Sequence, residues 1–91
     1  MVRVVVVYEG EPEDGRYEQH VALCEQVPGA VFRHGKVVRT IVGDELKYYA
    51  EFEFPDMESF KAASGTDEFR ATGQDAAEMG IPRSIYLVDV K

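Results

Sequence analysis

The sequence predicts an α+β fold of the split βαβ, or ferredoxin-like, type, in which a four-stranded antiparallel sheet carries two helices on one face. Three observations predict it. Four segments are rich in β-branched and aromatic residues, as strands are. Two segments with apolar residues at helical spacing separate them. Their order is strand, helix, strand, strand, helix, strand. With 91 residues, the chain has room for one domain spanning residues 1–91.

The first strand is predicted at residues 2–8, where four consecutive valines favour strand structure through their branched Cβ atoms. A segment dense in Gly, Pro, Glu and Asp then predicts a loop. A helix is predicted at residues 14–27, because apolar residues recur there at helical spacing, and the pair Pro28-Gly29 ends the pattern.

Two antiparallel strands are predicted next, at residues 30–42 and 47–54, with a turn at residues 43–45. The second of them has two unlike faces, because successive side chains of a strand point to opposite sides. One face carries Tyr48, Ala50, Phe52 and Phe54; the other carries Tyr49, Glu51 and Glu53.

The second helix is predicted in two parts. Asp56 is placed to cap the first part, the pair Ser64-Gly65 interrupts it, and Thr66 is placed to cap the second part. Gly80 closes the helix, and the last strand is predicted at residues 84–90.

The first and last predicted strands carry apolar side chains on both faces, which leaves the face without helices too apolar for exposure to water. An identical sheet is the simplest cover, and homo-oligomers usually have twofold symmetry. We therefore expect a homodimer with a space between its two sheets. The residues concerned are Val4, Val5, Val6, Val7, Ile85, Tyr86, Leu87 and Val88.

Charge and cysteine content exclude several classes of partner. The formal net charge is −7, so nucleic acid and anionic membranes would be repelled. The apolar run Val4–Val7 is too short for a membrane span. Cys24 is the only cysteine, which excludes an internal disulfide and fits a reducing compartment. We expect a cytoplasmic protein.

The sequence lacks C-x-x-C, H-E-x-x-H, G-x-G-x-x-G and G-x-S-x-G patterns and has no phosphate-binding loop. Its two histidines lie far apart, so a structural zinc site is not expected. We expect no bound metal and no cofactor. Cys24, on the predicted buried side of its helix, is expected to act as a small apolar residue.

Residues 17–29 resemble the first helix of the EthD family, whose pattern is Y-x-x-H-x-P-L, then an apolar residue and Pro-Gly. The matching residues are Tyr17, His20, Leu23, Pro28 and Gly29, while Ala22 stands where the family often has proline. The resemblance implies a dimeric α+β barrel, with relatives linked to degradation of ether or aromatic compounds and to polyketide pathways. Similar barrels include muconolactone isomerases, polyketide cyclases, and cofactor-independent and haem-degrading monooxygenases.

Two residues are candidates for proton transfer. His20 is a candidate because an imidazole group titrates near neutral pH, and it would shuttle a proton at a bound substrate; alternatively, it only hydrogen-bonds a loop or a partner subunit. Glu51 would face the space between the sheets, where loss of hydration raises the pKa of a carboxyl group and makes it a general base. Alternatively, Glu51 pairs with an arginine on a neighbouring strand.

Four further residues are candidates for substrate binding. Tyr8, Tyr49 and Tyr86 lie on predicted strands, where phenol groups line cavities or stack on an aromatic ligand. Plain core packing is the alternative for each. His34, in a polar stretch, would form a pocket rim or a solvated strand edge.

Two functional hypotheses follow. The first is a small-molecule enzyme of a catabolic or secondary-metabolite pathway. It would perform cofactor-independent proton transfer or oxygenation, of the cyclase, isomerase or monooxygenase type, on an aromatic or polyketide-like substrate. The second is a non-catalytic ligand-binding or dimerisation module that accompanies a larger enzyme. A haem-degrading oxygenase is a third option, and it requires an axial ligand near the cavity.

Overall fold

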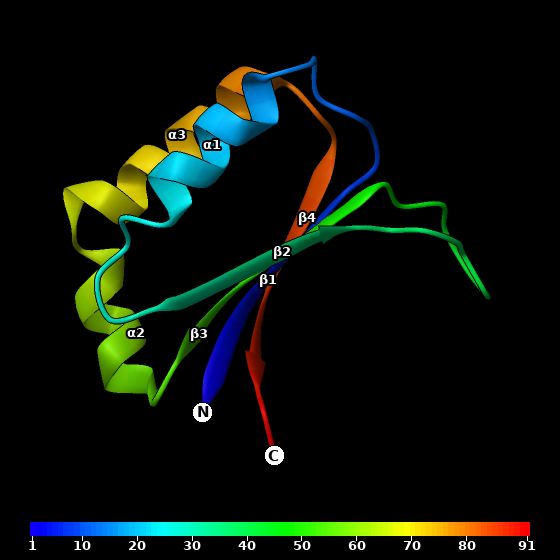
Figure 1. Cartoon of the computed structure of the whole chain (residues 1–91). Helices are drawn as coiled ribbons and strands as arrows, with labels where there is room; N and C mark the ends of the chain where they lie inside the picture. Colours follow the sequence, from blue (N-terminus) through cyan, green and yellow to red (C-terminus); the bar gives the residue numbers. More distant parts are fainter.

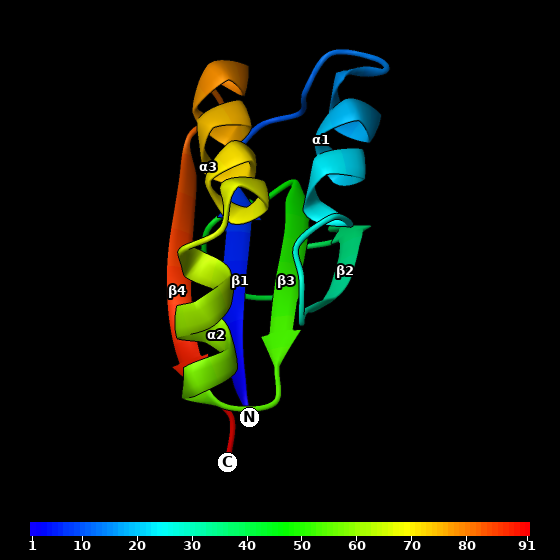
Figure 2. The same cartoon turned by 90° about the vertical axis from the view of Figure 1, so that its left-hand side faces the viewer.

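The computed structural model describes all 91 residues and has the predicted ferredoxin-like fold. The four strands form one antiparallel sheet in the order β2-β3-β1-β4. All helices lie on one face of this sheet, and the other face carries none (Figures 1 and 2). The elements are β1 (Val2–Tyr8), α1 (Arg16–Cys24), β2 (Val31–Lys36), β3 (Tyr48–Phe54), α2 (Met57–Ser64), α3 (Asp67–Met79) and β4 (Arg83–Asp89).

The core lies between the sheet and the helices, and the two central strands form its floor. In β1 every second residue is buried, from Val2 to Tyr8. These residues pair across the sheet with the apolar face of β3, where Val4 lies opposite Phe52 and Val2 opposite Phe54. The period of two in the sequence therefore becomes one buried, aromatic-rich surface under the helices.

Both predicted helix caps in the second half of the chain are present. The carboxylate of Asp56 accepts a hydrogen bond from the Ser59 amide at 2.7 Å, and the Thr66 hydroxyl accepts one from the Phe69 amide at 3.2 Å. Gly80 ends α3 with φ of 70°, a left-handed conformation that glycine adopts at little cost. These contacts fix where α2 and α3 begin and end.

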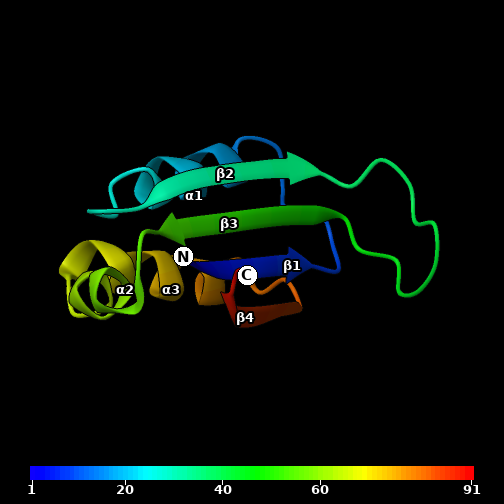
Figure 3. The same cartoon turned by 90° about the horizontal axis from the view of Figure 1, so that it is seen from below.

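Two predicted elements are shorter than expected. Helix α1 covers Arg16–Cys24 instead of residues 14–27, because Gly15 precedes it with φ of 80° and supplies no side-chain cap. Strand β2 ends at Lys36 instead of residue 42. Residues 37–47, here called the arm, leave the sheet and project beyond the strand ends (Figure 3). A two-stranded ribbon without a layer to pack on is only marginally stable, which explains why the strands stop.

The open face of the sheet carries both charged and apolar side chains. Arg3, Val5 and Val7 point to this side of β1 and are partly exposed. Tyr86 and Val88 of β4 lie beside them and are 55% and 40% exposed. None of the helices is both long and apolar enough to cross a membrane.

Phe54 should be the most stability-critical side chain of the core, because it is 0% exposed and packs edge-to-face on Phe60 of α2. We expect Phe54→Ala to lower the free energy of unfolding by about 3–5 kcal/mol, as large-to-small changes of buried aromatic residues do. Urea denaturation followed by circular dichroism measures this. Gln74→Ala, at an exposed position of α3, is the control and should stay within about 0.5 kcal/mol. A similar loss in both variants would contradict the position of the core.

Candidate functional site

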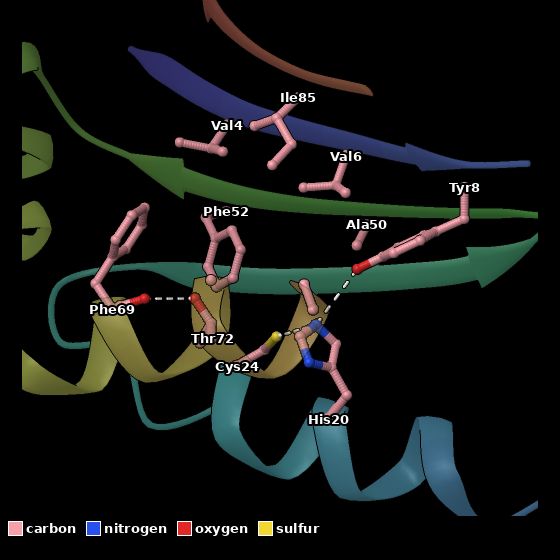
Figure 4. Close-up of a pocket in the computed structure, with 12 residues that line it drawn as sticks. Val4, Val6, Tyr8, His20, Cys24, Ala50, Phe52, Phe69, Thr72 and Ile85 are labelled. Carbon is pink, nitrogen blue, oxygen red and sulfur yellow. Dashed lines mark hydrogen bonds between the residues drawn. The ribbon is translucent and has the colours of Figure 1, made fainter. Parts of the chain in front are cut away.

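A small apolar cavity lies on the helix side of the sheet, beneath α1 and α3 (Figure 4). Its volume is about 100 Å³, and 9 of its 12 lining residues are hydrophobic. The strands contribute its floor and the Tyr8 hydroxyl, and the helices contribute its roof and the remaining polar groups. Among the residues that line the cavity are Tyr8, His20, Cys24, Thr72 and Ile85.

His20 is the polar centre of this cavity. Its side chain projects from α1 toward the sheet and is almost completely buried, at 4% exposure for the residue. The Nδ1 atom lies 2.8 Å from a carboxylate oxygen of Asp75 in α3. The Nε2 atom lies 3.3 Å from the Tyr8 hydroxyl and 3.4 Å from the Cys24 sulfur. The imidazole therefore bridges the two helices with one nitrogen and faces the cavity with the other.

Asp75 fixes the orientation of this imidazole. The Arg16 guanidinium donates to both carboxylate oxygens, at 2.7 and 3.0 Å. These hydrogen bonds, together with the one from His20, hold the pKa of Asp75 below its usual value. An ionised Asp75 accepts a hydrogen bond from Nδ1–H, so in the neutral ring Nε2 is left as the hydrogen-bond acceptor.

Tyr8 and Cys24 both present hydrogen-bond donors to Nε2. Burial is the largest cause that raises the pKa of the Tyr8 phenol to about 12. Burial likewise raises the pKa of the Cys24 thiol to about 12. Both groups therefore stay protonated at neutral pH, and Cys24 does not act as a thiolate nucleophile. What remains is a basic ring nitrogen at an apolar surface, the arrangement that a general base requires.

Glu51 lies on the opposite face of the sheet from His20. This is the face on which the sequence placed Glu51, toward the space between two sheets, so the two candidates for proton transfer do not share one cavity within the chain. Glu51 pairs instead with Arg3 at 3.3 Å and Arg33 at 3.2 Å, the alternative that the sequence left open. Tyr49 belongs to this second group, since its hydroxyl donates to Glu51 at 3.0 Å.

The other predicted binding residues are dispersed. Tyr8 lines the apolar cavity, whereas Tyr86 is on the open face. His34 is exposed on β2, where its ring stacks on Phe32 with centroids 5.5 Å apart. It lines a separate open groove together with Tyr17 and Tyr48. No group of three or more His, Cys, Asp and Glu side chains is arranged to hold a metal ion.

Two residues of the His20 cluster were not predicted. Asp75 lies three residues after Thr72 and four before Met79, so a carboxylate interrupts the apolar stripe of α3. Arg16 lies one turn before His20, on the same face of α1. A charge within an otherwise apolar helix face was the available signal. Nothing in the sequence connects the contacting residues, because Asp75 lies 59 positions from Arg16 and 55 from His20.

The fold defines the class of protein: the chain is a ferredoxin-like domain. Two solved structures with this fold are described as dimeric proteins. No family model matches the sequence, and no curated protein matches it either. The assignment to this fold class is therefore supported by the comparison with solved structures.

Among solved structures, the chain is similar to an ethyl tert-butyl ether D (EthD) family protein from Bacillus halodurans. The two share 25% identity over 100% of this chain and 99% of that one, with a TM-score of 0.80. A dimeric ferredoxin-like protein of unknown function from Jannaschia shares 19% identity over 98% of both chains, with a TM-score of 0.79. SnoaB, a cofactor-independent oxygenase from Streptomyces nogalater, shares 18% identity over 99% of this chain and 92% of that one, with a TM-score of 0.63.

Removing the Asp75 carboxylate should destabilise the protein and alter its response to acid. The pKa of Asp75 is lowered in the folded state, so its carboxylate stabilises the fold fully above its unfolded-state pKa of about 4. This contribution to stability is lost as the pH falls through the folded-state pKa. We expect Asp75→Asn to lower the free energy of unfolding at pH 7 by about 1–3 kcal/mol, because buried His20 and Arg16 lose an ionised partner. The deficit should shrink toward pH 3. Urea titrations between pH 3 and 7 measure it.

Asp67→Asn is the matched control, because Asp67 also pairs with an arginine, Arg70, but its side chain is 94% exposed. Exposed pairs contribute about 0–1 kcal/mol. Equal losses in the two variants, or a deficit of Asp75→Asn that does not depend on pH, would contradict the role assigned to Asp75.

Proposed function

We propose that the chain is an EthD-like small-molecule enzyme in which His20 acts as a general base without a bound cofactor. The observation that supports this most is the series of contacts from Arg16 through Asp75 to His20, which ends with Nε2 at an apolar cavity. The buried carboxylate stabilises the imidazolium that forms when Nε2 takes a proton. This is the same division of roles as in other histidine bases that a carboxylate orients.

The proposed reaction begins with abstraction of a proton from an acidic C–H or O–H group of the substrate. The electron pair of that bond stays on the substrate as a carbanion or enolate. Reprotonation at another atom is an isomerisation, and attack on a carbonyl within the same molecule is a cyclisation. With dioxygen as the oxidant, a CH₂ group becomes C=O and the second oxygen atom leaves as water. The likeness to SnoaB supports the oxygenation branch.

The cavity favours an aromatic or polyketide-like compound of limited size. Its lining is mostly hydrophobic, and its volume is about 100 Å³. A cavity of about 150 Å³ holds a benzene molecule, so one ring enters only with small shifts of the lining side chains. We propose that the acidic end of the substrate reaches His20 while the remainder extends past Ile85, which is 54% exposed.

The first test is solvent hydrogen exchange, which depends only on the proton-abstraction step. The probe is 2-indanone, a single fused-ring ketone with an acidic CH₂ group, in D₂O and followed by NMR. The protein should accelerate exchange, and His20→Gln should reduce that acceleration by about 100-fold, the size of a general-base contribution. Oxygen uptake with phenolic ketones then separates oxygenation from isomerisation.

Glu51→Gln is the control for this experiment and also decides the role of Glu51. Since the ion pairs of Glu51 lie on the other face of the sheet, we expect exchange to stay within about threefold of the unmodified protein. Unchanged exchange in His20→Gln, or loss only in Glu51→Gln, would contradict the proposed base. If no ketone or phenol of the series reacts, the alternative of a ligand-binding module is supported instead.

We also propose that the protein is a homodimer through its open sheet face. Val5, Val7, Tyr86 and Val88 expose apolar surface there. The charged groups between them are already paired, since Arg3 contacts Glu53 at 2.8 Å and Arg33 contacts Glu51 at 3.2 Å. Paired charges cost less to remove from water than isolated ones. Similar proteins are described as dimeric.

Val88→Asp should weaken this dimer, because it places an unpaired charge at both copies of the interface. We expect the dissociation constant to rise by about 100-fold, corresponding to about 3 kcal/mol. Sedimentation equilibrium measures it. Ala22→Asp, an equivalent change at an exposed position of α1, is the control and should leave association unchanged. A monomer in the unmodified protein would contradict the dimer.

A further inference from the structure

The arm, residues 37–47, exposes more apolar surface than its own chain requires. Val38 is 96% exposed, Ile41 85% and Val42 91%. The arm is anchored to the sheet by backbone hydrogen bonds at its two ends, from Val37 to Lys47 and from Lys47 to Tyr8. It then extends away from the helices (Figure 1). Three exposed aliphatic side chains on one projecting segment indicate a surface that another molecule covers.

The edge strand β4 is the other incompletely covered apolar element. Ile85 and Leu87 pair with Val6 and Val4, so they point to the helix side of the sheet. They nevertheless remain 54% and 47% exposed, because β4 is packed mainly against β1 and not beneath a helix. Ile85 is also a wall of the apolar cavity. One wall of the proposed reaction site is thus open along β4.

A chain cannot cover its own β4 with its own arm. Strands β2 and β4 are the two opposite edges of the sheet. With two strands between them, they lie about 14 Å apart at the usual strand spacing. The arm also extends away from the helices, whereas the exposed side of Ile85 faces the helix layer. The occupant of this surface must therefore come from another molecule.

A twofold axis parallel to the strands brings the arm of a second copy to this position. Register places Lys36, Tyr48, Tyr8 and Arg83 side by side at one end of the sheet. The arm therefore begins at the end where β4 begins. When two open faces stack about 10 Å apart around an axis parallel to the strands, β2 of one copy lies over β4 of the other. The arm, which extends beyond its own open face, then passes the start of the partner's β4.

Charge supports the same contact. Arg83, at the start of β4, forms no ion pair within the chain, and its Nε atom is buried without a hydrogen-bond acceptor. The arm carries Asp44 and Glu45, which are exposed and form no ion pair either. An unpaired guanidinium and two unpaired carboxylates therefore lie on surfaces that the symmetry brings together.

We propose that, in the homodimer, the arm of each copy closes the cavity of the other, with Ile41 and Val42 covering Ile85 and the arm carboxylates pairing with Arg83. The site is then complete only when two copies associate. The contact rests on the proposed function in so far as the cavity is the reaction site. Its geometry is independent of any activity.

Cross-linking between differently labelled chains tests the contact directly. Chains carrying Ile41→Cys are mixed with chains carrying Ile85→Cys, and the mixture is oxidised and separated without reductant. A disulfide requires Cα atoms within about 7 Å, so a mixed dimer identified by mass spectrometry reports this pairing. We expect it to form at least tenfold faster than a mixed dimer of Ile41→Cys with Glu68→Cys, which places the second thiol at an exposed site on α3. Equal rates, or no mixed dimer, would overturn the contact.

A charge exchange tests the ion pair. Arg83→Glu alone, or Asp44→Lys with Glu45→Lys, should weaken dimerisation by about tenfold or more. The three changes combined should restore at least half of that loss on a logarithmic scale. Losses that simply add would contradict the pairing.

Closure of the cavity has its own measurement. A thiol introduced by Ile85→Cys stands on the open wall of the cavity, where Ile85 is 54% exposed in the single chain, so its modification by methyl methanethiosulfonate reports whether the arm covers that wall. Val42→Asn, at an exposed arm position, should accelerate modification at least fivefold at concentrations where the dimer persists. Rates that do not change would overturn closure. Because this readout needs no turnover, failure of His20 as a base leaves it unaffected, and failure of closure leaves the hydrogen-exchange test unaffected.

Discussion

The contact between Asp75 and His20 links the two helices that lie above the cavity. It joins α3 to α1 at 2.8 Å, and Arg16 adds a second link from the start of α1 to the same carboxylate. Both bonds are largely shielded from solvent, with the Asp75 side chain 16% exposed. Hydrogen bonds to a charged group contribute about 1.5–3 kcal/mol. The two helices are therefore held at a fixed spacing, and the space beneath them remains open instead of collapsing.

Side chains alternate between the two faces of the sheet, and the two faces therefore differ in their electrostatic environment. One face holds neutral polar groups and the other holds ion pairs. On the helix side, burial keeps Tyr8 and Cys24 protonated, with pKa values raised to about 12. On the open side, Arg3 holds the pKa of Glu53 below its usual value and keeps that carboxylate ionised. Neutral donors around one histidine suit proton transfer, whereas matched ion pairs suit an interface. Shifting β3 by one residue would turn Glu51 and Glu53 toward the helix side of the sheet.

Local patterns predicted the fold, because each depends on residues close in sequence. The valine run, the alternation in residues 48–54 and the caps at Asp56 and Thr66 all act within a few positions, and all are present. The pairing of Asp75 with His20 was not predictable in this way, because the topology brings together residues 55 positions apart. The sequence placed Glu51 on the face away from the helices, where it lies, but it did not show into which cavity the His20 side chain would project. The arm was missed because Val38, Ile41 and Val42 favour strands, and only the absence of a packing layer ends β2 at Lys36.

The cavity supports the proposed function, because larger side chains at its lining positions would give a better-packed core. Small residues line it where larger ones would fill it, namely Ala50 in β3 and Gly73 and Ala76 in α3. An unfilled volume of about 100 Å³ costs about 2 kcal/mol at roughly 24 cal/mol per Å³. A Cβ atom added to Gly73 would have no neighbour within 4 Å, so an alanine there would meet no clash and would favour the helix by about 1 kcal/mol. Packing therefore does not require the glycine. The charged link between α1 and α3 lies above this space, which Nε2 of His20 faces, and an open space at that nitrogen is what the proposed base requires.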